Sequence, residues 1–329
     1  MIVRSSAFVR LLGAGMVAGA LAWAGPAAAQ TAQVALGDTV SVETLAMVVA
    51  LERAKEKGFD YKLTSFAKED LAIQAVIGGQ AEVGIATPYA VMQKTKAPLR
   101  GLMQLTQLVF FPVADKSIKT WKDLDGQPFT FHARGSGTEA IGNILAKRNN
   151  ISFGQRNYIA GSENRIVAML NGQIKATIVD LANKNLLMEK GGDKFHVLPK
   201  LDQAASDEIL FARTDYIEKN AAKVDLLVEE FARLWTEMAK NPGIVEQERA
   251  KRGLLKDQPK EVVDKVPGFY AQGVKEGVFS PQGGGAAAVK TDFEFYVEAG
   301  QLQGPVEALK LEDFWNLGPL DRARKKIGS

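Results

Sequence analysis

Cysteine is absent from this sequence of 329 residues, and histidine occurs only twice. The lack of cysteine excludes disulfide cross-links, cysteine nucleophiles and thiolate metal ligands, so the fold must be stabilised by its core alone. The two histidines, His132 and His196, lie far apart in the chain and lack the spacing of a helical metal site. We therefore expect neither a metal ion nor another cofactor.

The sequence also lacks a strong excess of either charge, and it has no long hydrophobic run beyond residue 25. It contains 41 lysine and arginine residues against 38 aspartate and glutamate residues, which gives a formal net charge of +3. Nucleic acids and anionic membranes attract strongly basic proteins, so we expect neither as a partner. No later segment has the ~20 consecutive apolar residues that a membrane-spanning helix requires.

The first thirty residues differ in character from the rest of the chain. Arg4 and Arg10 precede an apolar run, Leu11–Gly25, and a short stretch of alanine follows. A basic start, a short apolar middle and small residues before a cleavage point are typical of a secretory signal peptide. We expect a cut after Ala29, so that residues 1–29 are removed and the mature protein acts outside the cytoplasm. A buried N-terminal helix and an uncleaved anchor are the alternatives.

Short apolar runs alternate with longer stretches of helical spacing in the mature chain. We expect strands at Gln33–Leu36, Tyr61–Phe66 and Glu82–Ala86, and helices at Thr39–Glu56, Lys68–Ile77 and from Thr87 onward. This order predicts the α/β class, with a mostly parallel sheet flanked by helices. A second alternation of the same kind follows the long apolar run Leu99–Val113, and from residue 214 the pattern is mainly helical, with a long helix at Asn220–Met238.

Four turns that follow predicted strands carry the polar residues with which a ligand could be held. In a parallel α/β sheet such turns lie together at the carboxyl ends of the strands. Each also begins a helix, whose free N–H groups and positive dipole end attract anions. The predicted binding residues are Asp38, Thr39, Thr87, Tyr89, His132, Arg134, Gly135, Ser136, Gly137, Thr138 and Asp180.

Each of these candidates also has a purely structural interpretation. Asp38 and Asp180 could accept hydrogen bonds from a ligand or cap the next helix, and Tyr89 could line a pocket or pack in the core. His132 could bind a ligand or be a core side chain whose hydrogen bonds are satisfied within the protein. Arg134 could bind a ligand or extend into solvent.

The segment Arg134–Thr138 is the richest of the four turns. It fits a capping box through Ser136 and Glu139. Gly135–Ala140 also matches the dinucleotide pattern G-x-G-x-x-A, but no well-placed acidic residue supports that interpretation.

Four sequence motifs, in this order, resemble those of a known family. They are residues 72–84 (AIQAVIGGQAEVG), residues 121–126 (WKDLDG) with 135–138 (GSGT), residues 168–176 (AMLNGQIKA), and residues 313–316 (DFWN). The chain resembles the periplasmic solute-binding proteins of ABC importers for nitrate, sulfonates, taurine and thiamine-precursor pyrimidines. The resemblance covers essentially the whole mature chain.

The resemblance implies a type II periplasmic binding protein with two lobes, each a mostly parallel sheet flanked by helices. It places residues 30–112 and 214–329 in lobe 1 and residues 113–213 in lobe 2, with hinge crossings near Phe111–Ala114 and Ala212–Thr214. It also implies that the protein is a periplasmic monomer, that it delivers a small organic solute to an ABC permease of the inner membrane, and that it is not an enzyme.

The charge of the candidate site bears on the solute. Asp38 and Asp180 sit where a site for a bare oxyanion would prefer neutral donors. We therefore expect an organic solute with an acidic group, such as a sulfonate, an amino-sulfonate or a carboxylate, together with an amine, a hydroxyl or a ring nitrogen. The alternatives are a periplasmic enzyme that uses His132 with Ser136, a pyrimidine-synthase-like relative, and the ligand-sensing subunit of a membrane receptor.

Overall fold

The computed structural model describes residues 31–202 and 205–328. The predicted signal peptide lies outside the described residues. The strands are β1 (Ala32–Leu36), β2 (Tyr61–Ser65), β3 (Val83–Ala86), β4 (Leu99–Gln104), β5 (Phe111–Asp115), β6 (Phe129–Phe131), β7 (Arg156–Tyr158), β8 (Ala176–Val179), β9 (Phe195–Val197) and β10 (Ile209–Arg213).

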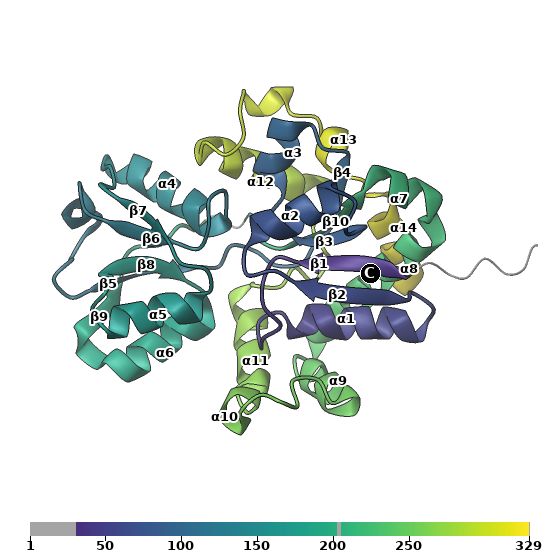
Figure 1. The fold of residues 1–329 in the computed structure, drawn as a ribbon, viewed down its shortest axis with the longest axis horizontal. Coiled ribbons are helices and arrows are strands. Elements are labelled where there is room, and N and C mark those ends of the chain that lie inside the picture. The colour runs from purple at the N-terminus through teal and green to yellow at the C-terminus, as the bar shows by residue number, and fades with distance from the viewer. Residues whose placement is uncertain (1–30, 203–204, 329) are drawn as a thin grey trace, which may run out of the picture. The chain divides into compact units, whose positions relative to one another are not determined.

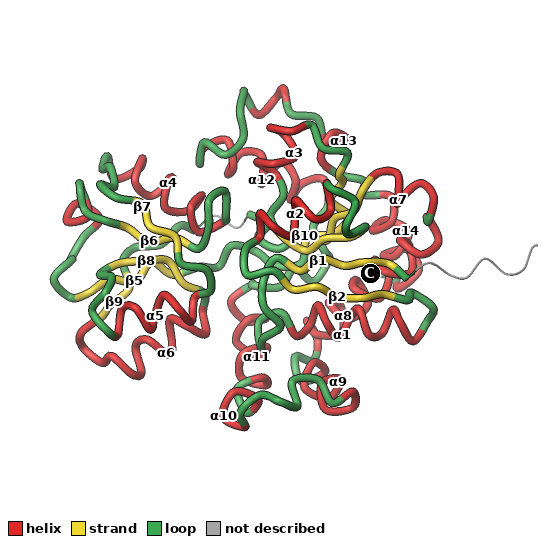
Figure 2. Tube along the Cα trace, in the orientation of Figure 1, coloured by secondary structure: helices red, strands yellow, loops and turns green. Residues whose placement is uncertain are grey.

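The helices that follow these strands are mostly longer than the strands themselves (Figures 1 and 2). They are α1 (Leu45–Glu56), α2 (Glu69–Ile77), α3 (Tyr89–Thr95), α4 (Gly137–Asn149), α5 (Ser162–Leu170), α6 (Leu181–Gly191), α7 (Thr214–Lys219), α8 (Ala221–Lys240), α9 (Ile244–Arg252), α10 (Lys260–Val263), α11 (Val266–Glu276), α12 (Ala286–Glu298), α13 (Leu311–Phe314) and α14 (Gly318–Ile327).

The strands form two sheets of five, in the orders β2-β1-β3-β10-β4 and β7-β6-β8-β5-β9. In the first sheet β10 runs antiparallel to both of its neighbours, β3 and β4. In the second sheet β5 runs antiparallel to β8 and β9. Each sheet is thus mostly parallel, and its one reversed strand is the first that the chain enters after changing sheet. This confirms the predicted α/β class.

Helices cover both faces of each sheet, as the alternation of buried residues requires. Val34 and Leu36 of β1 pack in one hydrophobic cluster with α1 and α8, whereas Ala35 belongs to a second cluster with α2 and α12. In the second sheet, α5 and α6 lie on one face and α4 on the other (Figure 1).

Three predicted boundaries differ from the structure. Helix α1 begins at Leu45 rather than Thr39, because residues 41–44 form a turn in which Thr44 Oγ1 donates to the carbonyl of Thr39. The run Leu99–Val113 is two strands in different sheets rather than one. The chain has already returned to the first sheet at Ile209, so the second crossing precedes β10 and does not fall near Ala212–Thr214.

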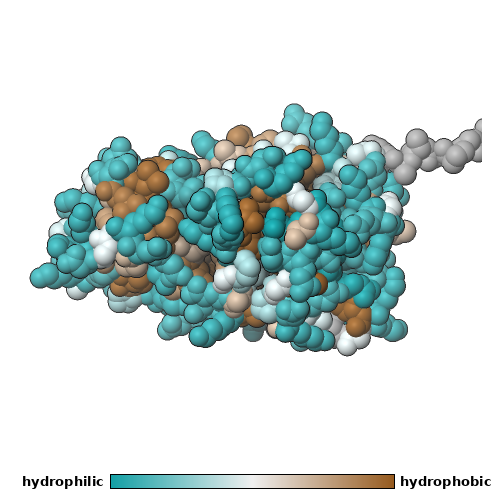
Figure 3. Space-filling model, turned by 90° about the horizontal axis from the view of Figure 1, so that it is seen from below, coloured by the Kyte–Doolittle hydropathy of each residue, from teal (hydrophilic) through white to brown (hydrophobic). Residues whose placement is uncertain are grey.

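The surface of the described residues is largely polar. Figure 3 shows one face, on which hydrophilic side chains predominate and hydrophobic ones gather in smaller patches. Leu71 and Val167 are among the few large hydrophobic side chains that are exposed. Within residues 31–202 and 205–328, no helix combines the length and the apolar character that a bilayer span requires.

Candidate functional site

A cavity of about 90 Å³ is lined by residues from elements of both sheets. A single water needs only about 10–15 Å³ of such space, so the cavity has room for a small solute. The first sheet supplies the segments that follow β1 and precede β10, together with the N-terminal end of α2. The second supplies the segments that follow β6 and β8, the N-terminal ends of α4 and α5, and the segment before β5.

The reversed strands explain why these segments meet. Ile209 at the start of β10 pairs with Ala86 at the end of β3, and Phe111 at the start of β5 pairs with Val179 at the end of β8. The residues before each reversed strand therefore lie at the same edge as the carboxyl ends of the parallel strands. This is the edge at which α/β sheets bind ligands.

Six of the eleven predicted binding residues line this cavity. They are Asp38, His132, Ser136, Gly137, Thr138 and Asp180. All six come from turns that directly follow a parallel strand, because the strand direction fixes the place of such a turn; that they bind a ligand stays a prediction.

Ser136 lies at the N-terminal end of α4 but does not cap it. Its Oγ donates to the carbonyl of Ala133 at 2.8 Å, and no side-chain cap bond is formed. The carboxylate of Glu139 accepts instead from the N–H of Gly135 at 2.8 Å. The capping-box interpretation is thus wrong for Ser136, whose side chain stabilises the turn and lines the cavity.

Asp180 combines both interpretations that the sequence left open. Its Oδ1 accepts from the backbone N–H of Asn183 at 2.9 Å, which caps α6, and its Oδ2 accepts from the Asn183 amide at 2.8 Å. It also lines the cavity. The same Asn183 amide donates to Glu43 Oε1 at 3.1 Å, so this contact joins α6 of the second sheet to the segment before α1.

The structure places Tyr89 in the core, not at the cavity. Its side chain is only 1% exposed. The Tyr89 hydroxyl donates to Asp292 Oδ2 at 2.5 Å and accepts from Trp315 Nε1 at 2.8 Å. Tyr89 is the first residue of α3 and is turned away from the edge of the sheet by these two partners, which come from the C-terminal part of the chain.

The other four predicted residues flank the cavity without lining it. Thr39 and Arg134 are exposed, and the Arg134 guanidinium lies 5.0 Å from the ring centroid of Tyr158. Gly135 belongs to the turn before α4 and does not reach the cavity wall. Thr87 is buried one layer behind the cavity, where its Oγ1 donates to the carbonyl of Asp207 at 2.9 Å.

Most residues of the cavity wall were not predicted from the sequence. The polar ones are Glu43, Thr44, Glu69, Thr106, Gln107, Ser162, Arg165, Asp207 and Glu208, and the apolar ones are Met47, Val109, Phe110, Leu181, Phe269, Val278 and Phe279. Asp207 and Glu208 directly precede a strongly apolar strand. This position is the one local feature of the sequence from which their place in the cavity wall could have been predicted. It was missed because the sheet was expected to be parallel at this point.

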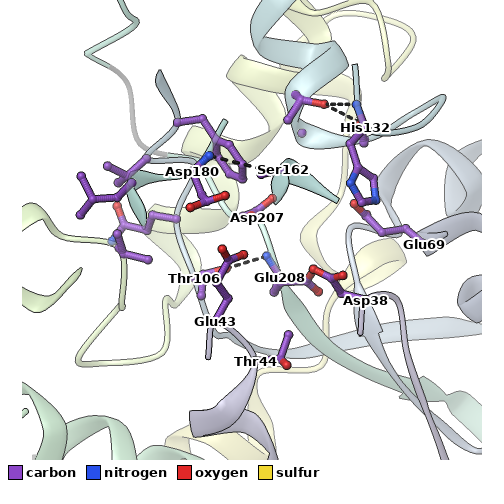
Figure 4. Close-up of a pocket in the computed structure, with 18 of the residues that line it drawn as sticks. Asp38, Glu43, Thr44, Glu69, Thr106, His132, Ser162, Asp180, Asp207 and Glu208 are labelled. Carbon is purple, nitrogen blue, oxygen red and sulfur yellow. Dashed lines mark hydrogen bonds between the residues drawn. The ribbon is translucent and has the colours of Figure 1, made fainter. Parts of the chain in front are cut away.

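The wall contains six carboxyl groups, from Asp38, Glu43, Glu69, Asp180, Asp207 and Glu208 (Figure 4). Burial, the largest cause, raises the pKa of Asp38 to about 6 and that of Glu69 to about 7. Burial likewise raises the pKa of Glu43, Asp207 and Glu208 well above the usual value, and their acidic neighbours add to the shift. The raised pKa values mean that these carboxyl groups hold protons more tightly in the empty site than they would in water, so the charge of the wall is smaller than the number of its acidic residues.

Arg165 is the one positively charged side chain of the described cavity wall. It is 1% exposed, and its guanidinium donates to the carbonyl of Ile159 at 2.9 Å, to Ser162 Oγ at 2.8 Å and to the carbonyl of Ile178 at 3.1 Å. Burial lowers the pKa of Arg165 to about 10, so it stays protonated at neutral pH. Its hydrogen bonds are thus directed mainly to its own surroundings.

His132 presents a polar atom without a protein partner. Its Nδ1 accepts from the N–H of Gly161 at 3.2 Å, which assigns the ring proton to Nε2. Nε2 is buried and has no hydrogen-bond partner among the described residues. Burial, with the nearby charge of Arg165, lowers the pKa of His132 to about 4, so the ring is neutral at pH 7 and offers one N–H donor.

Comparison with solved structures shows that the fold is shared with binding proteins. A protein from Bordetella bronchiseptica RB50 superposes with a TM-score of 0.73 at 18% identity, over 91% of this chain and 98% of its own. The alkanesulfonate-binding protein SsuA from Xanthomonas axonopodis pv. citri, bound to MOPS, has a TM-score of 0.64 at 15% identity, over 87% and 98%.

The periplasmic nitrate-binding protein NrtA from Synechocystis PCC 6803 superposes with a TM-score of 0.66 at 12% identity, over 90% of this chain and 89% of its own. At these identities the likeness establishes the fold and not the ligand. It confirms the predicted architecture of a periplasmic binding protein. None of the curated proteins matches the sequence.

The family itself follows from a sequence match. The model of the NMT1/THI5-like family matches residues 44–244, which is more than half of the chain. This segment includes three of the four motifs on which the resemblance was based, and most of the residues that line the cavity. The chain therefore belongs to the NMT1/THI5-like family and has the fold of the periplasmic binding proteins.

Proposed function

We propose that this chain is the solute-binding protein of an ABC import system, which encloses a small organic solute and presents it to a membrane permease. The observation that carries the proposal is the cavity, which is built from polar loops of both sheets at the ligand-binding edge of each. The family match and the binding proteins that share the fold support it.

The two sheets, each with its helices, are proposed to act as two lobes that open and close around the solute. Polar contacts between them include that of Asn183 with Glu43 at 3.1 Å, that of Asn143 Nδ2 with the carbonyl of Ala299 at 3.0 Å and the ion pair of Arg148 with Glu298 at 2.8 Å. One hydrophobic cluster also extends from α12 to α4, so opening is proposed to take place around this apolar contact. A solute that touches both lobes would favour the closed arrangement, because only there are all its contacts made.

Export to the periplasm, removal of residues 1–29, action as a monomer and delivery to an inner-membrane permease are part of this proposal. The signal-peptide pattern of the sequence supports export, and proteins that share this fold include the periplasmic nitrate-binding protein NrtA. A ligand-sensing role at a membrane receptor would use the same cavity. Co-purification of the protein with a permease or with a receptor distinguishes the two roles.

The expected acidic group on the solute is not supported by the charges of the cavity. That expectation took account of only two carboxylates, Asp38 and Asp180, whereas the wall holds six and a single arginine. A sulfonate or carboxylate would be repelled by those of the six that are ionised, and the arginine offsets only one charge.

The proposal is tested by the thermal stability of the mature protein in the presence of a small-molecule extract. A solute at one hundred times its dissociation constant adds about 2.7 kcal/mol to the free energy of unfolding. We expect the melting temperature to rise with the extract, and the active compound to be recovered chemically unchanged. An unchanged melting temperature would count against solute binding.

Recovery of a converted compound would support an enzyme instead. The structure does not favour the pair of catalytic residues considered above. The Ser136 hydroxyl donates to the carbonyl of Ala133, and His132 Nδ1 accepts from Gly161. Within the described residues no hydrogen bond joins the His132 ring to Ser136, so the histidine is not placed to activate this hydroxyl.

A further inference from the structure

The charges of the cavity identify the chemical class of the solute. This inference rests on the proposed function, because it concerns the ligand of the same site. Six carboxyl groups and one guanidinium group line the cavity, and the only other titratable side chain of the wall is the neutral imidazole of His132. The proteins of the same fold that are named for sulfonate and nitrate bind anions. The wall of this cavity has mainly acidic side chains, which favour a cation instead.

The carboxyl groups converge on one space from different directions. Asp38, Glu43, Asp180 and Glu208 all line the cavity, and Figure 4 shows their side chains arranged around one space. Glu43 comes from the loop before α1, and Asp180 comes from the end of β8 in the second sheet. A ligand between them would therefore meet carboxylates of both sheets.

The side chain of Glu208 indicates most clearly that a hydrogen-bond partner is missing from the cavity. Glu208 lines the cavity, and its Oε2 is buried and has no hydrogen-bond partner among the described residues. Asp180 differs, because both of its oxygens accept from Asn183. A buried carboxylate oxygen without a donor costs free energy, and a ligand that brings an N–H group would remove that cost.

Arg165 does not neutralise the wall. Its guanidinium already donates to two backbone carbonyls and to Ser162. It supplies one positive charge, whereas six carboxyl groups share the space, so a ligand cation could take the place of protons that burial holds on these groups. Acidic clefts of this kind concentrate cations.

Part of the remaining wall is apolar and aromatic, which argues for an organic ion. Phe110, Phe269 and Phe279 line the cavity together with Met47 and Leu181. Aromatic faces attract organic cations, and apolar walls accommodate their carbon skeletons. The carboxylates are also spread around the space: in the part of the chain that the structure describes, no three acidic or histidine side chains are grouped closely enough to hold a metal ion.

We infer that the solute is an organic cation that carries at least one protonated nitrogen, held between Glu208, Asp38 and the carboxylates that face them. The neutral ring of His132 offers its Nε2–H group to an acceptor atom elsewhere on the same solute. The apolar wall formed by the phenylalanines encloses the carbon skeleton.

The charge of the ligand is tested by fractionation of the extract. A small-molecule extract of the producing cells and their medium, treated with a metal chelator, is separated at neutral pH on cation- and anion-exchange resins. The melting temperature of the protein is then measured with each fraction. We expect stabilisation by the fraction that the cation exchanger retains.

Stabilisation by the anion-exchanger fraction or by the unretained fraction would overturn the inference and leave the proposed function intact. No stabilisation even by the whole extract would overturn both. Zn²⁺ and Ca²⁺ are added alone as further probes, and stabilisation by a metal ion in place of the chelated cation fraction would contradict an organic ligand.

A variant pair links the effect to the cavity. In Glu208→Gln we expect the affinity for the stabilising fraction to fall about tenfold or more, because one charge-assisted hydrogen bond is lost. The melting temperature of the empty variant is also measured, as the check that the substitution leaves the fold intact. Glu261→Gln, on the exposed side of α10, is the matched control and should change neither value. Unchanged affinity in Glu208→Gln would contradict the inference.

Discussion

Glu69 and Asp70 show how little a local sequence reveals about the site. They are adjacent acids in the first turn of α2, where either would favour the helix dipole. In the structure Asp70 is exposed, whereas Glu69 is turned inward, accepts from the N–H of Thr87 at 3.1 Å and lines the cavity. Glu69 enters the site because the turn after β3 lies beside it and supplies the N–H of Thr87. The sequence of α2 alone contains no information about the position of that turn.

Buried carboxyl groups make the stability of the empty protein depend on pH. Burial raises the pKa of Asp38 and Asp292 from 3.8 to about 6 and that of Glu69 from 4.5 to about 7. The folded protein therefore binds these protons more tightly than the unfolded chain, and stability decreases as the pH rises between the two values.

We predict that the free energy of unfolding of the empty protein, measured with urea, is lower at pH 8 than at pH 5. The variant Glu69→Gln should show a smaller difference between the two pH values, because one of the titrating groups is removed. A wild-type protein that is more stable at pH 8 would show that other groups dominate its titration.

The helices and strands that were predicted correctly have a clear pattern of apolar and polar residues within their own sequence. The long amphipathic helix expected at Asn220–Met238 is α8, which buries one side against α1 and α14. The strands β1, β2 and β3 were predicted to within one residue at each end because they are short runs bounded by polar turns.

The direction of β10 could not be predicted in the same way. Its sequence shows only an apolar run, and whether a strand is parallel depends on the path of the chain before it. The prediction therefore sought binding residues only after strands. Asp207 and Glu208 stand before one and were missed, although Ile209 pairs with Ala86 at the edge where the cavity lies.

The helix α3 provides a test of the structural role now assigned to Tyr89. Its hydroxyl links Asp292 of α12 and the indole of Trp315, and the Asp292 carboxylate also accepts from the N–H and the hydroxyl of Ser206. In Tyr89→Phe we predict a loss of stability of about 1–3 kcal/mol, because buried hydrogen bonds are removed.

Solute affinity should remain within about twofold of the wild type in this variant, since Tyr89 does not line the cavity. Urea unfolding measures the stability, and isothermal titration with the stabilising fraction measures the affinity. A variant with wild-type stability but a large loss of affinity would show that Tyr89 belongs to the binding site after all.

At the scale of the whole molecule, the arrangement of the two sheets depends on a close approach at Gly137. A Cβ atom at this position would lie 2.2 Å from Leu108 Cδ2 and 3.0 Å from Asp207 Oδ1. Leu108 precedes β5 and Asp207 precedes β10, so both contacts are made by the segments in which the chain changes sheet. Glycine at this position thus permits these segments to pack closely against the start of α4.

We predict that Gly137→Ala remains folded but binds the solute more weakly, because closure would cost about 1–3 kcal/mol more. Thermal stabilisation by the solute should shrink, and small-angle X-ray scattering with solute should give a larger radius of gyration than for the wild type. Gly268→Ala is the control, because a Cβ at that position meets no atom within 4 Å. Equal affinity in both variants would show that closure does not require this approach.

A crystal structure of the mature protein with the stabilising fraction tests the central claim most directly. The account predicts a bound solute in the cavity between the two sheets, with a nitrogen within hydrogen-bond distance of Glu208 or Asp38. A solute bound elsewhere on the chain would contradict the assignment of the site, and an anion in this cavity would contradict the assignment of the ligand.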